Sequence, residues 1–467
     1  MGRMLTGLLD LYRDGARDAE STKHFLPITI RTVELSAPVQ SIIAERAQNQ
    51  MGREVAYGSA LVLARLNGEP IGLATVPLTQ GRATAEMAAE HLWACLHSRI
   101  LERVAPSGAK LPLDGRDLLR GLDGSAQGRP LPALDPSHAP DVTVVVATTG
   151  RDELNRCLHS LRSLRYPCYE VLVVDNDPGS PSARRIVDTH AREDGRIRYT
   201  AEQFHNLSVA RNHGITQTDA EIVAFTDDDV IVDPDWLLAL VRAFLRDPQV
   251  AGVTGLVLPA ELETRAQWYF EEYRAFGRGF EPRVFDLDRH RSNDKLLYPY
   301  WGGVVGSGNS MAFSRAALLD VGGFDPALGG PAPTSPGVED ADVFTRLLLS
   351  GHRLTYEPRA VCWHAHRRDE EALRRQLFSY GLGLTALLTK WVLRHPALGM
   401  SIVAAIPKVL AGSPTARPGR RPGLPGRFRR AEIAGYFVGP ALYARSTART
   451  RQHRLAAPRR ERWQRSE

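Results

Sequence analysis

The chain has 467 residues, of which 43% are hydrophobic and 24% charged, and its formal net charge is +6. This is an ordinary globular composition, and the length allows two or three domains with a large core. The four cysteines show no paired metal-ligand spacing and are too few for a disulfide scaffold, so they fit a reducing compartment. The only apolar stretch between Met1 and Glu20 contains charges, which argues against a signal peptide and for a cytoplasmic protein.

Residues 1–105 predict a small α+β unit. Two apolar runs between Glu54 and Pro77 are joined by Asn67-Gly68, a typical hairpin turn, and Ala83 to Val104 reads as an amphipathic helix. Nothing in this unit indicates a chemistry. Residues 106–140 are rich in proline, glycine and aspartate, and are expected to form a linker.

Strands and helices alternate from residue 141 onward. The runs Val142–Ala147 and Glu170–Asp175 are continuous and rich in β-branched residues, as expected of buried parallel strands, and each is followed by a helical segment. This alternation predicts an α/β domain over residues 141–370, built on a doubly wound and mostly parallel sheet.

A further apolar run, Glu221–Thr226, leads directly into Asp227, Asp228 and Asp229. Such a strand places three carboxylates at the edge where open α/β sheets bind ligands, and a bound Mg²⁺ or Mn²⁺ would relieve their repulsion. The alternative is a solvated acidic turn before the next helix, since Asp233-Pro234 resembles a helix cap. That cap accounts for Asp233 but not for the three aspartates, so the sequence favours a cation site.

Seven short motifs follow one another between Val142 and Arg367. They are VVVATTGRD at 144–152, VVDN at 173–176, NLSVARNHG at 206–214, the three aspartates, GSGNSM at 306–311, GGFD at 322–325 and VEDADV at 338–343. In this order they resemble a bacterial family-two glycosyltransferase of the GT-A fold, and the resemblance covers about half of the chain. It implies transfer of a sugar from a nucleotide-diphosphate donor with inversion at the anomeric carbon.

The resemblance assigns the donor site to residues at the strand ends and on the helix that precedes the aspartates. Asp175 matches the acid that hydrogen-bonds the base or ribose of the nucleotide, and Thr148 opens the loop beneath it. Asp228 is assigned to the donor as well, because on an extended backbone it points away from its two neighbours. Arg211 either supplies positive charge to the donor or forms a structural ion pair at the acidic edge.

The resemblance also implies a Mg²⁺ or Mn²⁺ ion that bridges the donor diphosphate. Asp227 and Asp229 match the ligands of the DxD motif. His364 matches a histidine that in some members binds the metal through neutral imidazole, and a buried core histidine is the competing interpretation. His366, two residues farther on, is the poorer candidate.

The acceptor side is assigned to the Glu339-Asp340 pair and to residues before it. Asp340 matches the general base that activates the acceptor hydroxyl, and Glu339 is expected to orient or bind the acceptor. The alternative is that the pair caps the following helix. Asn309 resembles the floor of the acceptor site, and Trp301 either stacks on a sugar ring or packs in the protein.

The C-terminal part is apolar and basic. From Lys390 on, it holds 17 of the 59 Lys and Arg residues but only 3 of the 53 Asp and Glu residues. Within residues 371–445, the runs Phe378–Leu393 and Ala397–Leu410 are near the lower limit for a membrane span, and fit better as helices in an anionic membrane interface. Helices packed on the α/β domain are the alternative, and residues 446–467 are expected to be a disordered basic tail.

The sequence therefore predicts a metal-dependent glycosyltransferase at the cytoplasmic face of a membrane. Its expected partners are a nucleotide-sugar donor, a lipid-linked or cell-envelope glycan acceptor and an anionic membrane, but not nucleic acid. A sugar nucleotidyltransferase would share the fold, although such enzymes have a glycine-rich loop with an arginine after the first strand and no use for Glu339-Asp340. A non-catalytic carbohydrate- or nucleotide-binding protein would need no metal site aligned with a base.

Overall fold

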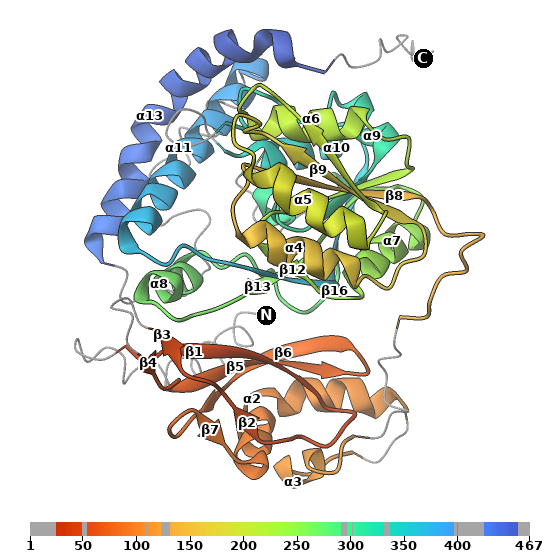
Figure 1. Ribbon diagram of the computed structural model, residues 1–467, viewed down its shortest axis with the longest axis vertical. Coiled ribbons are helices and arrows are strands. Elements are labelled where there is room, and N and C mark those ends of the chain that lie inside the picture. The colour runs from red at the N-terminus through yellow and green to blue at the C-terminus, as the bar shows by residue number, and fades with distance from the viewer. Residues whose placement is uncertain are drawn as a thin grey trace.

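The computed structural model describes residues 25–48, 54–107, 111–122, 131–290, 297–300, 302–330, 337–396, 399 and 425–455. A large α/β domain carries a pair of long helices along one side, and a smaller unit formed by the N-terminal part of the chain lies against it (Figure 1). Trp301 and nearly all of the apolar run 397–410 lie outside the described residues.

The large domain is built on a nine-stranded sheet. Its strands are, in spatial order, β10 (Ile197–Ala201), β9 (Tyr169–Asp175), β8 (Val142–Thr148), β11 (Ile222–Asp227), β15 (Met311–Ser314), β13 (Val250–Pro259), β16 (Arg353–His364) and β12 (Val230–Val232), with β14 (Arg283–Phe285) paired to β16. Strands β8 to β11 are parallel, whereas β15 is antiparallel to both of its neighbours. The predicted α/β class with a mostly parallel GT-A-type sheet is confirmed.

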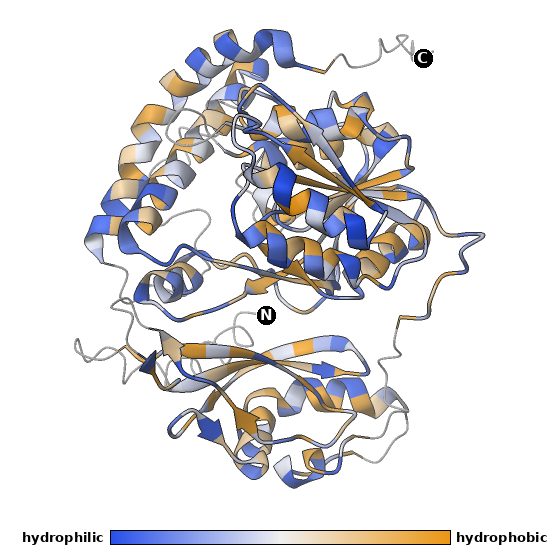
Figure 2. Cartoon of the chain, in the orientation of Figure 1, coloured by the Kyte–Doolittle hydropathy of each residue, from blue (hydrophilic) through white to orange (hydrophobic). Residues whose placement is uncertain are grey.

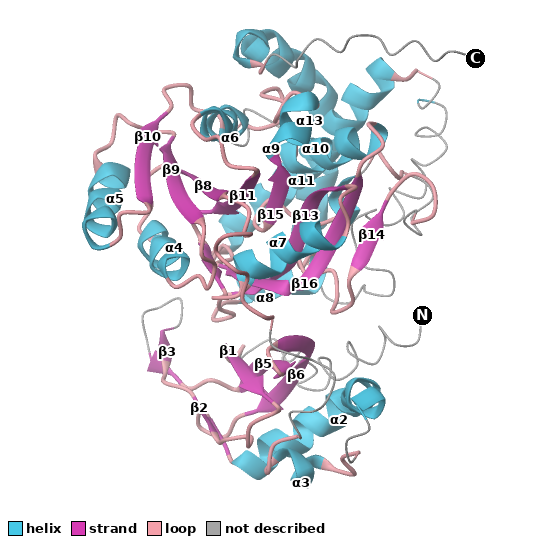
Figure 3. Ribbon diagram, turned by 90° about the vertical axis from the view of Figure 1, so that its right-hand side faces the viewer, coloured by secondary structure: helices cyan, strands magenta, loops and turns pink. Residues whose placement is uncertain are grey.

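Alternation along the central strand explains why helices cover both faces of this sheet (Figure 3). Val144 and Val146 belong to the core beneath α4 (Glu153–Arg162), α5 (Ser182–Glu193) and α7 (Trp236–Arg246). Val145 belongs to the opposite core, which includes residues of α6 (Leu207–Thr216), α9 (Arg315–Asp320) and α10 (Glu339–Leu349).

The ends of β9 and β11 meet at one edge of the sheet, as the sequence predicts. Both strands pair with β8, where Asp175 lies opposite Thr148 and Asp227 lies opposite Ala147. The two acidic strand ends are therefore separated by a single strand.

The N-terminal unit has a three-stranded sheet of β1 (Ile28–Glu34), β5 (Ser59–Leu66) and β6 (Glu69–Pro77), covered by α2 (Ala85–Val104). The predicted β5–β6 hairpin is confirmed, with Asn67 and Gly68 at φ values of 51° and 79°. Short strands β2 (Ile42–Ile43) with β7 (Arg82–Ala83), and β3 (Ala47–Gln48) with β4 (Glu54–Val55), complete it. Helix α3 (Gly115–Leu118) joins the same core through Leu118, so part of the segment assigned to a linker packs in this unit.

The N-terminal unit is attached to the α/β domain by buried polar contacts. Arg65 on β5 lies 2.6 Å from Asp233, and Tyr57 donates a hydrogen bond of 2.6 Å to Glu263. The backbone N–H of Ile28 also donates to the carbonyl of Leu262. The expectation that Asp233 caps a helix is corrected in its position: Asp235 holds the N-cap position of α7. Asp233 pairs with Arg65 and accepts a hydrogen bond of 3.0 Å from the backbone N–H of Asp235 in the turn before the helix.

The two long helices are α11 (Glu370–Arg394) and α13 (Gly426–Thr450), which pack along each other. Helix α11 also contacts the α/β domain through buried Lys390, whose Nζ lies 2.7 Å from Asp325 and 2.6 Å from Asp342. In the described part of the chain, no helix combines the length and apolarity of a membrane span. Apolar residues gather mainly on the strands and on the buried helix faces (Figure 2).

Candidate active site

Asp227 is the last residue of β11, and both of its carboxylate oxygens have partners. Oδ1 accepts a hydrogen bond of 2.8 Å from Arg211, and Oδ2 accepts one of 2.7 Å from Asn309. Its side chain is still 30% exposed. Asp227 is therefore partly exposed, and its orientation is fixed from two sides.

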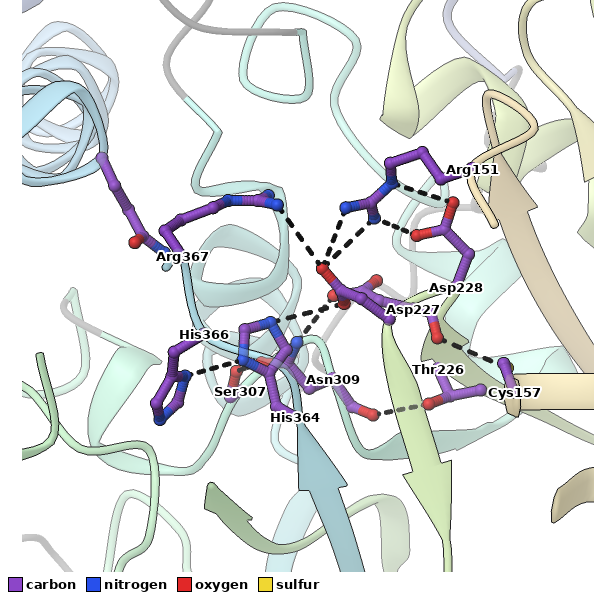
Figure 4. A network of polar contacts seen from close by, with 12 residues as sticks. Arg151, Cys157, Thr226, Asp227, Asp228, Ser307, Asn309, His364, His366 and Arg367 are labelled. Carbon is purple, nitrogen blue, oxygen red and sulfur yellow. Dashed lines mark hydrogen bonds and ion pairs between the residues drawn. The ribbon is translucent and has the colours of Figure 1, made fainter. Parts of the chain in front are cut away.

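Asp228 and Asp229 follow in the turn after β11, and both are buried. Arg151 contacts both carboxylates: it pairs closely with Asp228 (Figure 4), and it lies 3.2 Å from Asp229. Thr148 donates a further hydrogen bond of 2.7 Å to Asp228. Burial raises the pKa of Asp228, while the charge of Arg151 acts in the opposite direction.

Arg151 belongs to this acidic cluster, although the sequence analysis names it only as part of the motif at 144–152. Its position in the loop after the first strand, which begins at Thr148, is the feature of the sequence that indicates a role in the site. Loops at this edge of a parallel sheet contact ligands, so a cation there was a candidate for the acidic cluster or the donor.

Asp229 and His364 form the part of the site best suited to a cation. Asp229 Oδ1 is buried and has no hydrogen-bond partner, and His364 Nε2, at the end of β16, lies 3.4 Å from it. Burial lowers the pKa of His364 to about 4, so its imidazole is neutral at pH 7, as metal ligation requires. An unpartnered carboxylate oxygen beside a neutral histidine fits Mg²⁺ or Mn²⁺.

Among the described residues, no three His, Cys, Asp or Glu side chains already stand together in a metal-binding arrangement. Both carboxylate oxygens of Asp227 accept hydrogen bonds, from Arg211 and Asn309, whereas Oδ1 of Asp229 has no hydrogen-bond partner. The role of Asp227 as a ligand thus stays a prediction, while Asp229 Oδ1 and His364 Nε2 lie 3.4 Å apart as two potential donor atoms.

Arg211 connects the acidic end of β11 to the Glu339-Asp340 pair. It rises from α6, is buried, and donates from Nη2 to Asp227 and from Nη1 to Glu339 at 2.7 Å. Of the two interpretations of this residue, the structure shows the ion pair.

Glu339 and Asp340 lie in the first turn of α10, where Val338 is the N-cap residue. Asp340 accepts hydrogen bonds of 2.7 Å from the backbone N–H groups of Gly308 and Ala341. Burial raises the pKa of both carboxyl groups, although the charge of Arg211 acts against this increase. Because Val338 holds the N-cap position, neither carboxylate caps α10 from that position, and the role of the pair as base and acceptor ligand stays a prediction.

Asp175 is fully buried at the end of β9. Tyr199 donates to its Oδ2 at 2.8 Å, and the backbone N–H of Asp177 donates to its Oδ1 at 3.0 Å. Tyr199 lies on the neighbouring strand β10, which is why no local pattern pointed to it. The carboxylate is oriented by these two donors and lies next to Thr148.

Asn309 is buried between the end of β11 and the start of β15. Its amide donates to Asp227, and its side-chain oxygen accepts from Ser307. In this arrangement both polar atoms of the Asn309 side chain have protein partners, and its assignment to the acceptor site stays a prediction. The predicted contact of Trp301 with a sugar lies outside the described residues.

Comparison with known proteins indicates the family that the α/β domain resembles. Residues 143–318 match the model of the family "Glycosyl transferase family 2". The pre-mycofactocin glycosyltransferase of Mycobacterium tuberculosis is 32% identical over 313 residues, covering 63% of this chain, and the chain spans 58% of that relative's length. The glucosyl-dolichyl phosphate glucuronosyltransferase of Haloferax volcanii is 25% identical over 48% of this chain and 68% of its own length.

A mannosyltransferase of Pyrobaculum calidifontis, solved with GDP-Man and Mn²⁺, is 20% identical, covers 68% of this chain and 77% of its own, and has a TM-score of 0.40. The matched segment 143–318 contains β8, β9, β11 and the three aspartates in the order described above. On the family model, residues 143–318 therefore form a domain that matches glycosyl transferase family 2.

Proposed function

We propose that this protein transfers a sugar from a nucleotide-diphosphate donor to an acceptor hydroxyl, with inversion at the anomeric carbon and with Mg²⁺ or Mn²⁺. The observation that carries the proposal is the position of Arg211, which pairs with both Asp227 and Glu339. One buried guanidinium thereby holds the acidic end of β11 beside the residue that precedes Asp340. A donor bound at the acidic end of β11 would therefore lie next to a general base at Asp340.

Asp229 and His364 would hold the cation, with Asp227 at the opening of the site. When bound, the cation would stabilise the negative charge that develops on the departing nucleotide diphosphate. Asp175, oriented by Tyr199, would accept a hydrogen bond from the base or ribose of the donor. Thr148 and Asp228 would line the loop beneath the nucleotide.

Asp340 would accept the proton of the acceptor hydroxyl as that oxygen attacks the anomeric carbon. The two backbone N–H groups that bond Asp340 fix the direction of its carboxylate. Glu339 would act through Arg211, because its Oε1 is already paired there. Its Oε2 is buried without a hydrogen-bond partner and would be available to a group of the acceptor.

A lipid-linked or cell-envelope glycan is the acceptor class that we infer, at the cytoplasmic face of a membrane. One relative is named for glucosyl-dolichyl phosphate, a lipid-linked sugar. Helix α13 supports peripheral contact with an anionic membrane, because Phe437 is 79% exposed and Val438 41% exposed, between exposed Arg430 and Arg445. An apolar patch flanked by arginines suits a helix lying in the membrane interface.

The first test is calorimetric titration of UDP, GDP and dTDP into the full chain, each with and without Mn²⁺. We expect one nucleotide to bind in a Mn²⁺-dependent manner, and Asp229→Ala to abolish that dependence. Asp188→Ala is the matched control, since Asp188 is an exposed carboxylate on α5 that pairs with Arg184. Loss of binding in both variants would contradict a specific cation site at Asp229.

The second test separates a transferase from the other two classes. In Asp340→Asn we expect nucleotide binding to persist and turnover of the corresponding nucleotide sugar to be lost. A carbohydrate- or nucleotide-binding protein would show no turnover in the wild type. A sugar nucleotidyltransferase would form the nucleotide sugar from a sugar phosphate and a nucleoside triphosphate, and Asp340→Asn would not impair it.

A further inference from the structure

Two polar side chains that the proposed mechanism does not use lie in a row behind His364. His364 Nδ1 is 3.0 Å from His366 Nδ1, and His366 Nε2 is 3.0 Å from Glu271 Oε2 on α8 (Arg265–Tyr273). The side chain of His366 is 1% exposed and that of Glu271 is 15% exposed. The other end of the row is Asp229, whose Oδ1 lies 3.4 Å from His364 Nε2.

The chemistry of these contacts determines where the protons reside. An ionised carboxylate only accepts hydrogen bonds, so Glu271 requires a proton on His366 Nε2. A neutral His366 then has an unprotonated Nδ1, which accepts a hydrogen bond. With His366 in this neutral form, His364 donates from Nδ1, and a neutral His364 is left with a lone pair on Nε2.

The geometry at Asp229 agrees with this assignment. Although His364 Nε2 lies 3.4 Å from Asp229 Oδ1, the oxygen receives no hydrogen bond from it. A lone pair on each atom leaves two buried acceptors facing each other with no proton between them. A cation is the kind of ligand that satisfies both atoms.

The surroundings hold the row in place. The ring of Phe276 meets that of His364 edge-on at 5.2 Å, and the ring of Phe270 lies 4.5 Å from that of His366. Gln267, which forms the capping box of α8, donates to the backbone carbonyl of His366. The helix that carries Glu271 is thus attached to the segment that carries both histidines.

We propose that Glu271 and His366 are positioning residues that hold His364 in the tautomer with an unprotonated Nε2 directed at Asp229. This inference rests on the proposed metal-dependent function and assigns two residues to it beyond the DxD motif and His364. The partner that orients a metal-binding histidine raises metal affinity by fixing its ring and tautomer, and its loss typically costs about 10- to 100-fold in affinity.

The test compares Glu271→Met, which removes the acceptor, with Glu271→Gln, which keeps an oxygen acceptor in nearly the same volume. Arg265→Gln, at the other end of α8, is the matched control for a charge change on this helix. The first readout is the ¹⁵N spectrum of histidine in the metal-free full chain, with His364 assigned by the signal lost in His364→Gln. The second is Mn²⁺ affinity from electron paramagnetic resonance titration, with and without UDP or GDP.

In the wild type we expect His364 to carry its proton on Nδ1. In Glu271→Met we expect a mixture of the two His364 tautomers and an affinity for Mn²⁺ about 10- to 100-fold weaker, while Glu271→Gln and Arg265→Gln remain within about threefold of the wild type. Thermal unfolding of each variant, followed by circular dichroism, shows that the variants are folded. A variant that merely loosened α8 would lose stability without moving the proton of His364.

Two results would overturn the inference. One is a wild-type His364 with its proton on Nε2, which would mean that His366 donates to it; the other is a Glu271→Met variant with unchanged tautomer and Mn²⁺ affinity. Absence of Mn²⁺ binding to the wild type would instead contradict the metal site of the proposed function. The tautomer of His364 in the metal-free protein would then still decide whether Glu271 and His366 control it.

Discussion

Arg211 and Glu339 form a buried ion pair with an N–O distance of 2.7 Å, and their side chains are only 3% and 6% exposed. The two residues come from helices on the same face of the sheet, 128 positions apart in the sequence. Because Arg211 also pairs with Asp227, its guanidinium lies between the acidic end of β11 and the Glu339-Asp340 pair and reduces the repulsion between them.

Arg211→Met should strongly destabilise the protein. Removing one member of a buried ion pair leaves the other charge uncompensated, and here Asp227 and Glu339 would both lose the cation that pairs with them, although Asp227 would keep its hydrogen bond from Asn309. We expect the free energy of unfolding to fall by about 3–5 kcal/mol, measured by urea denaturation at pH 7. Arg184→Met is the control, because its pair with Asp188 is exposed and should contribute no more than about 0.5 kcal/mol. Equal losses in the two variants would show that the Arg211 pairs do not stabilise the fold.

On acidification, activity should begin to fall at a higher pH than it would with an aspartate base of ordinary pKa. Burial raises the pKa of Asp340 and Glu339, and a base functions only in its deprotonated form. The logarithm of kcat/KM should therefore be level at neutral pH and decline with a slope of about one as pH falls through the raised pKa. The measurement is the rate of donor turnover from pH 4 to 8. Full activity down to pH 4 would exclude a buried carboxyl group as the base.

The fold of the α/β domain could be predicted because its determinants are local. β-branched runs such as Val142–Ala147 predict buried parallel strands wherever they occur, and the acidic residues at the ends of β9 and β11 follow from the strand boundaries. The turn at Asn67-Gly68 is equally local, since both residues adopt positive φ. These features need no knowledge of distant residues.

The polar partners within the site could not be predicted, because they join residues far apart in the sequence. Arg65 and Asp233 are 168 positions apart, and His366 and Glu271 are 95 apart. Asp233 looked like a helix cap because its neighbours Pro234 and Asp235 carry that signal, and only the folded chain shows Arg65 beside it. The sequence makes His366 the poorer ligand candidate because strand alternation directs it like His364 but one step farther on, and only the folded chain shows its contact with Glu271.

Gly435→Leu should separate α13 from α11. A Cβ atom at Gly435 would lie 2.2 Å from the carbonyl oxygen of Phe378 and 2.7 Å from the backbone nitrogen of Leu382, closer than any side chain tolerates. Because both atoms belong to the backbone of α11, no rotamer change can relieve the overlap. We expect faster amide hydrogen exchange in both helices and destabilisation of roughly 1–3 kcal/mol or more. Ala434→Leu is the control, since Ala434 is exposed on the same helix and should exchange like the wild type.

Phe437→Ser should weaken the proposed binding to anionic membranes without affecting the fold. Phe437 is 79% exposed, so the substitution removes few contacts within the protein. Insertion of a phenylalanine side chain into an apolar phase is favourable by about 1.5–3 kcal/mol, which corresponds to a roughly tenfold or larger change in the partition coefficient. The measurement is co-sedimentation of the full chain with vesicles that contain phosphatidylserine.

Phe437→Leu should bind like the wild type. Arg430→Gln combined with Arg445→Gln should lower both the binding and its sensitivity to salt, because each basic residue near the surface contributes about 1 kcal/mol. Equal sedimentation of the wild type and Phe437→Ser would show that this face of α13 does not enter the membrane interface, and the exposed ring would then need another partner.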